Sequence, residues 1–445
     1  MKNIKISPGF RSGTVTAPPS KSLAHRALIC AALCEDDAAD ITNIDLSQDI
    51  GATVEALKVL TAGAADERIE RTERIERTER IIYCGESGST LRFLTPVAAA
   101  LGLNAVFTGE GRLPERPIDI YRDLFYDKGV KLELTSGGLP AKISGKLQPG
   151  RFYVPGDISS QFITGLLFAL PLLDGESEII LTSPLESEPY VNMTIEVLSV
   201  FGVTVERIDR KLDFVDMIVN MADTLVNKFS RAEKGYAVKG GQKYKSAGYT
   251  VEGDYSQAAV FACAAAINGD IKICGLNAVS SQGDIKIIEI LRKFGVRIDF
   301  RGDVLQVKKC DNLRGIKIDG SQIPDLVPVL AVVAAYAHGR TVISNAGRLR
   351  LKESDRIHAV AEMLAAIGAD VRETKSGLII NGGKKLRGGL VRAFNDHRIA
   401  MSAAAAAVGT EEGVTVDDMS CINKSYPGFL RDFEGQMTET AGQSV

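Results

Sequence analysis

A long-period repeat constrains the fold of this chain more than any other feature. Six segments share one design, in which a short polar cluster leads into an apolar, alanine-rich run typical of a buried helix. They begin at Leu23, Leu91, Phe162, Ala258, Leu326 and Ile399. The successive spacings are 68, 71, 96, 68 and 73 residues. Because four of the five spacings agree closely, we predict six copies of one structural module.

A second element recurs about midway between these runs. A helix-like stretch ends at a glycine and is followed by alternating apolar and polar residues, as around Gly129, Gly202, Gly295 and Gly368. Glycine suits the left-handed residue that ends many helices, and the alternation suits a strand. Each module is therefore predicted to be an α/β unit with two helices.

The longest spacing, 96 residues between Phe162 and Ala258, divides the six modules into two groups of three. It contains residues 210–250, where polar and glycine-rich sequence (KGGQKYKSAG) intervenes. A chain of 445 residues is too long for one ordinary core, so we predict two domains. The charged hexad repeat ERIERTERIERTERI, residues 67–81, is predicted to be a solvated hairpin or helix face without chemistry.

Composition excludes several classes of protein. No apolar run is long enough to span a bilayer, and MKNIKISPGF lacks the apolar core of a secretory signal, so we expect a cytoplasmic protein. The net charge of -3 argues against a general nucleic-acid binder. The seven cysteines lack a CxxC pair and the four histidines lack zinc-ligand spacing, so we predict reduced thiols and no metal.

The polar clusters at the helix starts carry the functional signal. They read PSKSLAHR, CGESGSTLR, GDISSQF, EGDYSQ, QIPD and FNDHR. Ser, Thr, Asp and Asn cap free backbone N–H groups, and an exposed set of such groups can bind an anion. Simple capping is the alternative interpretation, and it is favoured for EGDYSQ.

The first of these clusters indicates an anion site most strongly. Lys21 and Arg26 are costly to bury without partners, and Ser22 and Arg26 share one helix face at i, i+4. A bound anion would satisfy all three side chains. His25 points elsewhere on the helix and is interpreted as an ordinary core or surface histidine.

Two further clusters are rich in cations. They are GEGRLPERP, residues 109–117, and GRLRLKESDR, residues 347–356. For the second, a surface ladder of salt bridges is the competing interpretation. The glycine turn CGESGSTLR lacks the spacing of a nucleotide P-loop and is a weak signal by itself.

Taken together, these stretches resemble the 5-enolpyruvylshikimate-3-phosphate synthase family of enolpyruvyl transferases. Ten motifs occur in the family's order along nearly the whole chain: PPSKSLAHR, CGESGSTLRF, GEGRLPERP, SSQF, SEPY, VEGDYS, IPD, LKESDR, NDHR and KSYPGF. Any one of them is a weak signal. Ten in order, on a frame of six modules, make an accidental likeness improbable.

The resemblance implies an α/β fold of two domains. Each domain would consist of three βαβαββ-type modules around a pseudo-threefold axis, with the active site in the cleft between the domains. The N-terminal strand would belong with the second domain. The expected domains are therefore residues 19–250, on the shikimate 3-phosphate side, and residues 1–18 plus 251–445.

The activity implied is transfer of the enolpyruvyl group of phosphoenolpyruvate to the 5-hydroxyl of shikimate 3-phosphate, releasing phosphate. Both substrates are polyanions, and arginine forks suit their carboxylate and phosphate groups. The resemblance places shikimate 3-phosphate against Lys21, Ser22, Arg26, Ser159, Ser160, Gln161, Ser187, Tyr190, Asp325 and Lys352, with Arg26 on the shikimate carboxylate. It places phosphoenolpyruvate against Lys21, Gly88, Arg116, Gln161, Arg356, Arg398 and Lys424.

The resemblance also implies catalytic roles. Asp325 would be the base at the 5-hydroxyl, Glu353 would handle the methyl proton, and Lys21 and Lys352 would stabilise developing charge. Capping of a helix is the alternative for Asp325. No metal, nucleotide or redox cofactor is required, and we expect a monomer that binds neither nucleic acid nor membrane. Gly88 would leave room for glyphosate, so we expect a glyphosate-sensitive enzyme.

Two positions depart from a common form of the family pattern. Glu86 stands where many members have Asn near phosphoenolpyruvate, and Arg348 stands where some have Asn near the shikimate phosphate. A carboxylate beside an anion is unfavourable unless a neighbour such as Arg92 neutralises it.

Three other functions stay open at this point. The nearest is the related transferase acting on UDP-N-acetylglucosamine, although the loop GEGRLPERP lacks the cysteine typical of that enzyme. An RNA-end-processing or nucleic-acid-binding protein is less favoured because tryptophan is absent and aromatic residues are sparse. The last is an inactive anion-binding scaffold.

Overall fold

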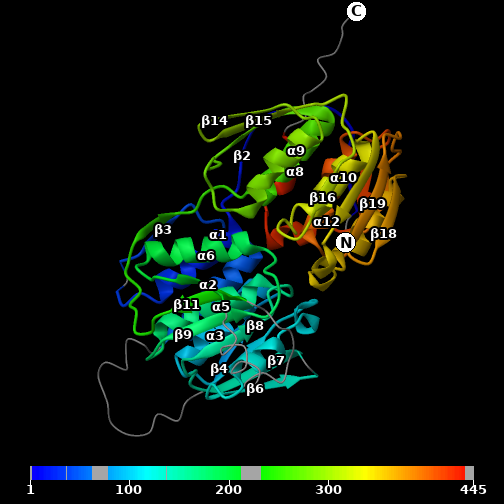
Figure 1. The fold of residues 1–445 in the computed structure, drawn as a ribbon. Coiled ribbons are helices and arrows are strands. Elements are labelled where there is room, and N and C mark those ends of the chain that lie inside the picture. The colour runs from blue at the N-terminus through cyan, green and yellow to red at the C-terminus, as the bar shows by residue number, and fades with distance from the viewer. Residues whose placement is uncertain (1–2, 37, 63–78, 137, 212–231, 436–445) are drawn as a thin grey trace, which may run out of the picture. The chain divides into compact units, whose positions relative to one another are not determined.

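The computed structural model of the chain describes residues 3–36, 38–62, 79–136, 138–211 and 232–435, which form two compact units (Figure 1). Unit 1 comprises Met1–His25, Ile41–Gly51 and Thr250–Val445, and unit 2 comprises Arg26–Asp40 and Ala52–Tyr249. The chain thus passes between the units four times, because residues 41–51 group with unit 1. The domain limits expected from the sequence stay a prediction, since contacts alone do not test what folds independently.

Unit 2 contains two four-stranded sheets of identical topology. The first has the order β4-β5-β7-β6, with β4 (Arg80–Tyr83), β5 (Ala105–Thr108), β6 (Val130–Thr135) and β7 (Gly138–Gly145). The second has the order β8-β9-β11-β10, with β8 (Arg151–Val154), β9 (Ser177–Leu181), β10 (Glu206–Lys211) and β11 (Ala232–Val238). In each, the first two strands are parallel and the others pair antiparallel.

The helices of these sheets complete a βαβαββ module in each case. Helices α3 (Gly88–Ala100) and α5 (Ser160–Ala169) link the parallel strands, and α4 (Ile120–Phe125) and α6 (Glu188–Val200) lead to the antiparallel ones. A right-handed parallel crossover needs a helix of this kind, whereas the last two strands need only a short turn. The predicted α/β unit with two helices is therefore present in both sheets of unit 2.

Unit 1 repeats the same topology in two further sheets. One has the order β2-β13-β15-β14, with β2 (Arg11–Thr16), β13 (Gly269–Cys274), β14 (Ile298–Arg301) and β15 (Val304–Lys308). The other has the order β16-β17-β19-β18, with β16 (Lys317–Asp319), β17 (Gly339–Ser344), β18 (Asp370–Thr374) and β19 (Gly377–Gly382). A smaller sheet has the order β1-β21-β20, with β1 (Ile4–Ile6), β20 (Gly389–Val391) and β21 (Val414–Val416).

The N-terminal strands join sheets made by the second half of the chain. Strand β2 pairs in parallel with β13, with Arg11 opposite Gly269 and Thr16 opposite Cys274. Strand β1 pairs antiparallel with β21, with Ile4 opposite Val416. Strand β2 takes the place that β4, β8 and β16 hold in their own sheets, so one module of unit 1 is built from two distant parts of the sequence.

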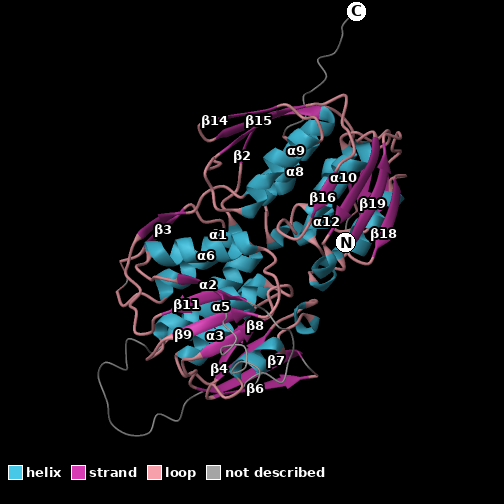
Figure 2. Cartoon of the chain, in the orientation of Figure 1, coloured by secondary structure: helices cyan, strands magenta, loops and turns pink. Residues whose placement is uncertain are grey.

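The six alanine-rich runs are helices, as predicted. They form α1 (Lys21–Ala32), α3, α5, α8 (Tyr255–Asn268), α10 (Val327–Tyr336) and α12 (His397–Ala407), coloured as helices in Figure 2. Helices α8, α10 and α12 contact one another within unit 1, and α3 contacts α5 within unit 2. All of α12 and all of α8 except Asn268 are buried. Alanine permits this close packing and loses no side-chain entropy on burial.

The predicted glycine stops are confirmed as well. Gly129, Gly202, Gly295 and Gly368 have φ values of 75°, 77°, 103° and 92°, which L side chains rarely adopt. They follow α4, α6, α9 (Ile287–Lys293) and α11 (Arg356–Ala366), and they precede β6, β10, β14 and β18.

The remaining elements belong to none of these five sheets or the helices already named. They are β3 (Asp40–Thr42), α2 (Gln48–Thr61), β12 (Gly248–Thr250), α13 (Phe429–Glu434) and the 3-10 turns η2 (Leu113–Glu115), η3 (Leu170–Leu172), η4 (Gly283–Lys286), η5 (Gly347–Leu351) and η6 (Ser420–Lys424). Most of the charged repeat at 67–81, and residues 212–231 of the predicted boundary region 210–250, lie outside the described residues, whereas the glycine-rich sequence KGGQKYKSAG lies within them.

Three properties of the described residues bear on function. None of their helices combines the length and apolarity needed to cross a membrane. In the same ranges, no group of three or more His, Cys, Asp or Glu side chains is arranged to hold a metal ion. The seven cysteines are free thiols, and four of them are buried.

Candidate active site

A buried carboxylate organises the charged cluster of unit 1. Asp396 is 0% exposed and accepts a hydrogen bond from the backbone N–H of Arg398 at 2.9 Å, which caps α12. It also accepts from Arg356 Nε at 2.8 Å and from Ser354 Oγ at 2.8 Å. The motifs NDHR and LKESDR, 40 residues apart, meet at this group.

Arg356 joins the two predicted proton-transfer residues. Its Nη1 lies 2.9 Å from Asp325 Oδ1 and its Nη2 lies 2.7 Å from Glu353 Oε2. Arg398 Nη2 approaches the other oxygen of Asp325 at 3.0 Å. Both arginines are buried, whereas the side chains of Asp325 and Glu353 are each 19% exposed. The structure therefore brings four predicted site residues together and leaves the carboxylates partly accessible.

The cations of this cluster determine the charge state of Asp325. Burial raises the pKa of Asp325, but Arg398, Lys352 and Arg356 outweigh burial and hold it well below its usual range. Burial, partly opposed by Asp325, lowers the pKa of Lys352 to about 8. Asp325 is thus ionised at neutral pH, and Lys352 is a cation that loses its proton within the accessible pH range.

Two further predicted cations lie in unit 1. Lys21 is the first residue of α1, and its Nζ lies 2.5 Å from Asp49 Oδ2. Lys424 is buried at the end of η6 and its Nζ donates to the carbonyl of Asn395 at 2.7 Å. Asn395 directly precedes the cap residue Asp396, so Lys424 contacts the same turn that holds Arg356. Ser22 follows Lys21 in the first turn of α1 and is half-buried.

In unit 2, Gly88 and Arg116 lie against each other. A Cβ atom added to Gly88, the first residue of α3, would lie 2.7 Å from Arg116 Nη2 and 2.8 Å from its Cζ. Arg116 is buried, so its guanidinium has little room to move away. Arg116 is predicted to bind phosphoenolpyruvate, and it can keep its observed position only if residue 88 is glycine.

Gln161 is held by neighbours from α3. Its Nε2 donates to Ser89 Oγ at 3.0 Å, and its Oε1 accepts from Arg92 Nη1 at 2.7 Å. Arg92 also donates twice to the carbonyl of Pro117, next to Arg116. This network fixes the amide of Gln161 and links it to the Arg116 loop.

The remaining predicted contacts of shikimate 3-phosphate lie at starts of helices in unit 2. Ser159 caps α5 by accepting from the backbone N–H of Gln161 at 3.3 Å, and Ser160 is the first residue of that helix. Ser187 precedes α6 with a left-handed backbone, φ 56° and ψ 39°. Tyr190 lies in the first turn of α6 and is half-buried.

Arg26 is expected to contact the shikimate carboxylate, but in the structure protein groups form hydrogen bonds with its guanidinium. Its Nε donates to Thr194 Oγ1 at 2.8 Å and its Nη2 donates to the Tyr190 carbonyl at 2.9 Å. The guanidinium stands over the ring of Phe93, 5.2 Å from its centroid. Burial lowers the pKa of Arg26 to about 10. Its role at the carboxylate stays a prediction.

The two departures from the family pattern have protein neighbours too. A Cβ atom on Gly111 would overlap the carboxylate of Glu86, so these two residues of unit 2 are in contact. Arg348 Nη2 donates to the Ser321 carbonyl at 2.6 Å, and Arg348 contributes to the lowered pKa of Lys352, after burial and Arg356.

Sequence reasoning missed three groups that contact the predicted residues. Asp49 pairs with Lys21, Asp396 anchors Arg356, and Ser256 accepts from Arg398 Nη2 at 2.6 Å. Asp396 lies inside the motif NDHR and Ser256 inside VEGDYS, but neither motif predicts these contacts. Asp49 has no local signal, since an acid in the first turn of a helix is ordinary.

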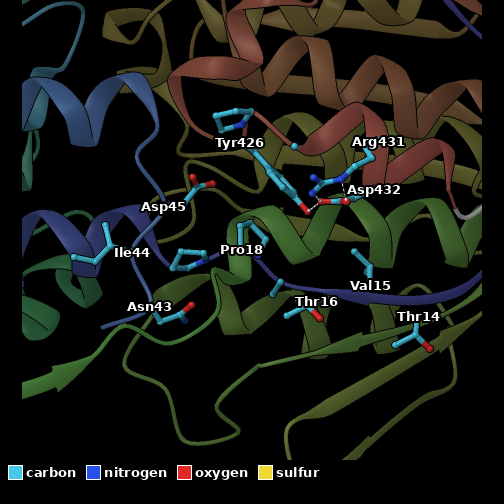
Figure 3. A pocket seen from close by; sticks show the side chains of 14 residues that line it. Thr14, Val15, Thr16, Pro18, Asn43, Ile44, Asp45, Tyr426, Arg431 and Asp432 are labelled. Atoms are coloured by element: carbon cyan, nitrogen blue, oxygen red, sulfur yellow. Dashed lines mark hydrogen bonds and ion pairs between the residues drawn. The ribbon is translucent and has the colours of Figure 1, made fainter. Parts of the chain in front are cut away.

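Unit 1 also contains a cavity of about 660 Å³ with a different lining (Figure 3). Its lining residues are 14–19, 43–45, 426–428, Arg431 and Asp432. The hydroxyl of Tyr426 donates to Asp432 Oδ2 at 2.8 Å beside it. None of the predicted site residues is in its lining, so this cavity is not the predicted active site.

Comparisons with known proteins agree on one family. The sequence model described as EPSP synthase (3-phosphoshikimate 1-carboxyvinyltransferase) matches residues 8–215 and 210–433. A protein of Clostridium novyi named 3-phosphoshikimate 1-carboxyvinyltransferase is 44% identical over 98% of this chain and 97% of its own length. One of the same name from Clostridium kluyveri is 43% identical over 97% of both.

Solved structures share the fold at lower identity. The EPSP synthase of Acinetobacter baumannii is 24% identical, with a TM-score of 0.72 over 98% of this chain and 97% of that one. The enolpyruvyl transferase NikO of Streptomyces tendae is 18% identical, with a TM-score of 0.70 over 98% and 97%. The predictions of the family, the α/β fold and an enzyme are confirmed. This chain belongs to the EPSP synthase (3-phosphoshikimate 1-carboxyvinyltransferase) family.

Proposed function

We propose that this chain transfers the 1-carboxyvinyl group of phosphoenolpyruvate to the 5-hydroxyl of shikimate 3-phosphate and releases inorganic phosphate. The observation that carries the proposal is the cluster in which Arg356 joins Asp325 to Glu353 while Arg398 holds Asp325. It contains two carboxylates for proton transfer and two fixed cations for an anionic donor. Membership of the family supplies the reaction and both substrates.

The two carboxylates take different roles in the proposed reaction. Asp325 removes the proton of the 5-hydroxyl as the oxygen attacks C2 of phosphoenolpyruvate, while Glu353 delivers a proton to the methylene carbon. The tetrahedral adduct then loses phosphate, which leaves with the proton held by Asp325, and the methyl group returns a proton to Glu353. Lys21 and Lys352 stabilise charge that develops on the substrates.

A substrate anion activates Asp325 in this scheme. In the described structure Arg356 and Arg398 both neutralise Asp325, which makes it a weak base. When the carboxylate or phosphate of phosphoenolpyruvate takes up their donors, the pKa of Asp325 rises towards an ordinary value. The base would therefore become effective only after the donor substrate has bound.

The residues of unit 2 are proposed to bind substrate without transferring protons. Gly88 and Arg116 would hold phosphoenolpyruvate, and Gln161 would contact both substrates. Ser159 and Ser160 lie at the start of α5, where free backbone N–H groups favour the phosphate of shikimate 3-phosphate. Ser187 and Tyr190 would contact the ring hydroxyls.

The assay that tests the function is phosphate release from phosphoenolpyruvate. Shikimate 3-phosphate and UDP-N-acetylglucosamine are each tried as acceptor, and each is omitted. We expect release only with shikimate 3-phosphate. Release only with the sugar nucleotide would support the alternative transferase, which the names of the relatives do not favour. Release with neither acceptor would reject the proposal.

Three further expectations accompany the function. The enzyme is proposed to act as a cytoplasmic monomer, and its reaction should proceed without a cofactor. Sedimentation at several protein concentrations tests the monomer. If no metal cofactor is needed, phosphate release should be complete after exhaustive chelation. Activity that is lost on chelation and restored by one specific metal would contradict this expectation.

A further inference from the structure

The turn before α8 does more than cap that helix. Asp254 Oδ1 accepts from the backbone N–H groups of Ser256 at 2.8 Å and Gln257 at 3.1 Å, which accounts for the capping expected of EGDYSQ. The side-chain hydroxyl of Ser256 is not needed for that cap. It donates to the same carboxylate oxygen in a short hydrogen bond.

The Ser256 hydroxyl also accepts from Arg398. Arg398 Nη2 donates to Ser256 Oγ at 2.6 Å, and Nη1 donates to the Ser256 carbonyl at 3.1 Å. One residue thus binds both terminal nitrogens of the guanidinium. Asp325 takes a second hydrogen of Nη2 at 3.0 Å, so the guanidinium is fixed in direction.

The hydroxyl and the arginine are buried together. Ser256 and Arg398 are each 5% exposed, and Asp254 is 4% exposed. The hydroxyl donates its one proton to a carboxylate while it accepts from a cation, and both bonds are charge-assisted. A side chain without a hydroxyl would leave Arg398 one acceptor short and Asp254 one donor short. Arg398 Nε is buried and has no hydrogen-bond partner among the described residues.

We propose that Ser256 is a positioning residue that aims the guanidinium of Arg398 at phosphoenolpyruvate. The inference rests on the proposed function, in which Arg398 binds that substrate. Asp254 would act through Ser256, and its second oxygen, Oδ2, accepts from the backbone N–H of Lys21 at 3.3 Å. The cluster EGDYSQ, interpreted from the sequence as a cap, would thus set the position of a substrate-binding arginine.

The test is the steady-state kinetics of Ser256→Ala in the full chain. We expect KM for phosphoenolpyruvate to rise about tenfold, which is the effect of losing one hydrogen bond to a charged group. KM for shikimate 3-phosphate should change less than twofold. Ser256→Cys fills the same space with a weak donor and acceptor, and should behave like Ser256→Ala.

The matched control is Tyr255→Phe. It also removes one hydroxyl from the first turn of α8, where Tyr255 donates to the Asn277 carbonyl at 2.8 Å, away from Arg398. Both KM values should stay at the wild-type level. In an Arg398→Gln background, Ser256→Ala should change kcat/KM for phosphoenolpyruvate less than twofold, because the two residues act through one contact.

The outcomes separate this inference from the proposed function. A wild-type chain that releases no phosphate with shikimate 3-phosphate rejects the function itself. An active wild type combined with an unchanged KM for phosphoenolpyruvate in both Ser256 variants rejects only the positioning role. Equal rises in the two KM values, or a full effect of Ser256→Ala without Arg398, would also overturn it.

Discussion

The absence of a side chain at Gly88 allows the guanidinium of Arg116 to lie where it does. Gly88→Ala would place a methyl group 2.7 Å from Arg116 Nη2, so the buried guanidinium must shift. We expect KM for phosphoenolpyruvate to rise about tenfold, as for loss of one charge-assisted hydrogen bond, with a smaller change in kcat. Steady-state phosphate release measures both constants.

Gly51→Ala is the matched control for that substitution. Gly51 lies in α2 and an added Cβ meets no atom within 4 Å. Alanine in a helix interior stabilises by about 0.5–1 kcal/mol relative to glycine, and KM should not change. An unaltered KM in Gly88→Ala would mean that Arg116 does not bind the donor substrate.

We expect Lys352 to make the reaction sensitive to alkaline pH. Burial lowers the pKa of Lys352 to about 8, so the side chain is a cation below that pH and becomes neutral above it. If the cation binds substrate, kcat/KM should be constant near pH 7 and fall about tenfold per pH unit above about 8. The measurement is kcat/KM for shikimate 3-phosphate from pH 6 to 10.

The control for this pH profile is Lys352→Arg. Arginine keeps its charge throughout that range, so the alkaline fall should disappear even if the overall rate is lower. The same fall in Lys352→Arg would assign the titration to another group, and no fall in the wild type would contradict the role of Lys352.

Residues inside recognisable motifs could be assigned from the sequence, and their partners could not. The motifs LKESDR and NDHR identified Glu353, Arg356 and Arg398, which lie in one cluster. The ion pair of Lys21 with Asp49 depends on how two helices pack, and no local pattern encodes it. The burial of Arg26 against Thr194 is of the same kind, because 168 residues separate the two.

At the scale of elements, helix starts hold the active cluster in place, and α12 is the clearest case. Its cap residue Asp396 is fully buried and binds Arg356 Nε at 2.8 Å. Asp396→Asn keeps a good capping residue but removes the charge that neutralises a buried arginine. We expect a loss of about 3–5 kcal/mol in the free energy of unfolding, measured by urea denaturation.

A similar cap on α11 provides the comparison. Asp355 accepts from the backbone N–H of His358 at 3.1 Å and pairs with Arg350 at 2.7 Å, but its side chain is 36% exposed. Asp355→Asn should therefore cost no more than about 1 kcal/mol. Equal losses in the two variants would show that capping, rather than the buried charge pair, is what Asp396 contributes.

Elements were more predictable than their pairing. The alanine-rich runs and the glycines after α4, α6, α9 and α11 are local signals, and the structure bears them out. Short strands such as β16 (Lys317–Asp319) carry no period long enough to detect. The partners of β1 and β2 lie hundreds of residues away, in β21 and β13, and no local pattern in one sequence displays such a pairing.

For the whole molecule, the N-terminal strands tie the two ends of the sequence into one unit. Ile6 and Val15 belong to the same hydrophobic core as α8, α10 and α12. Arg11 is 1% exposed, donates to the Ser7 carbonyl at 2.8 Å, and stands 5.4 Å from the centroid of the Phe433 ring. Unit 1 therefore depends on residues that are synthesised long before the rest of it.

This dependence predicts different behaviour for the two expected domains made as separate fragments. Fragment 19–250 keeps every strand of the two sheets of unit 2 and should unfold cooperatively in urea. Fragment 251–445 lacks β1 and β2, which leaves one edge of β13 and of β21 unpaired and part of the core uncovered. It should show little protection of its amide hydrogens from exchange.

Adding a peptide of residues 1–18 to fragment 251–445 provides the decisive comparison. Because binding to the folded state alone stabilises that state by mass action, protection in β13 and β21 should increase with peptide concentration. A peptide with Arg11→Glu, which places a carboxylate at a buried position beside Phe433, should have no such effect. Full protection of fragment 251–445 without any peptide would instead mean that the second domain folds from the C-terminal half alone.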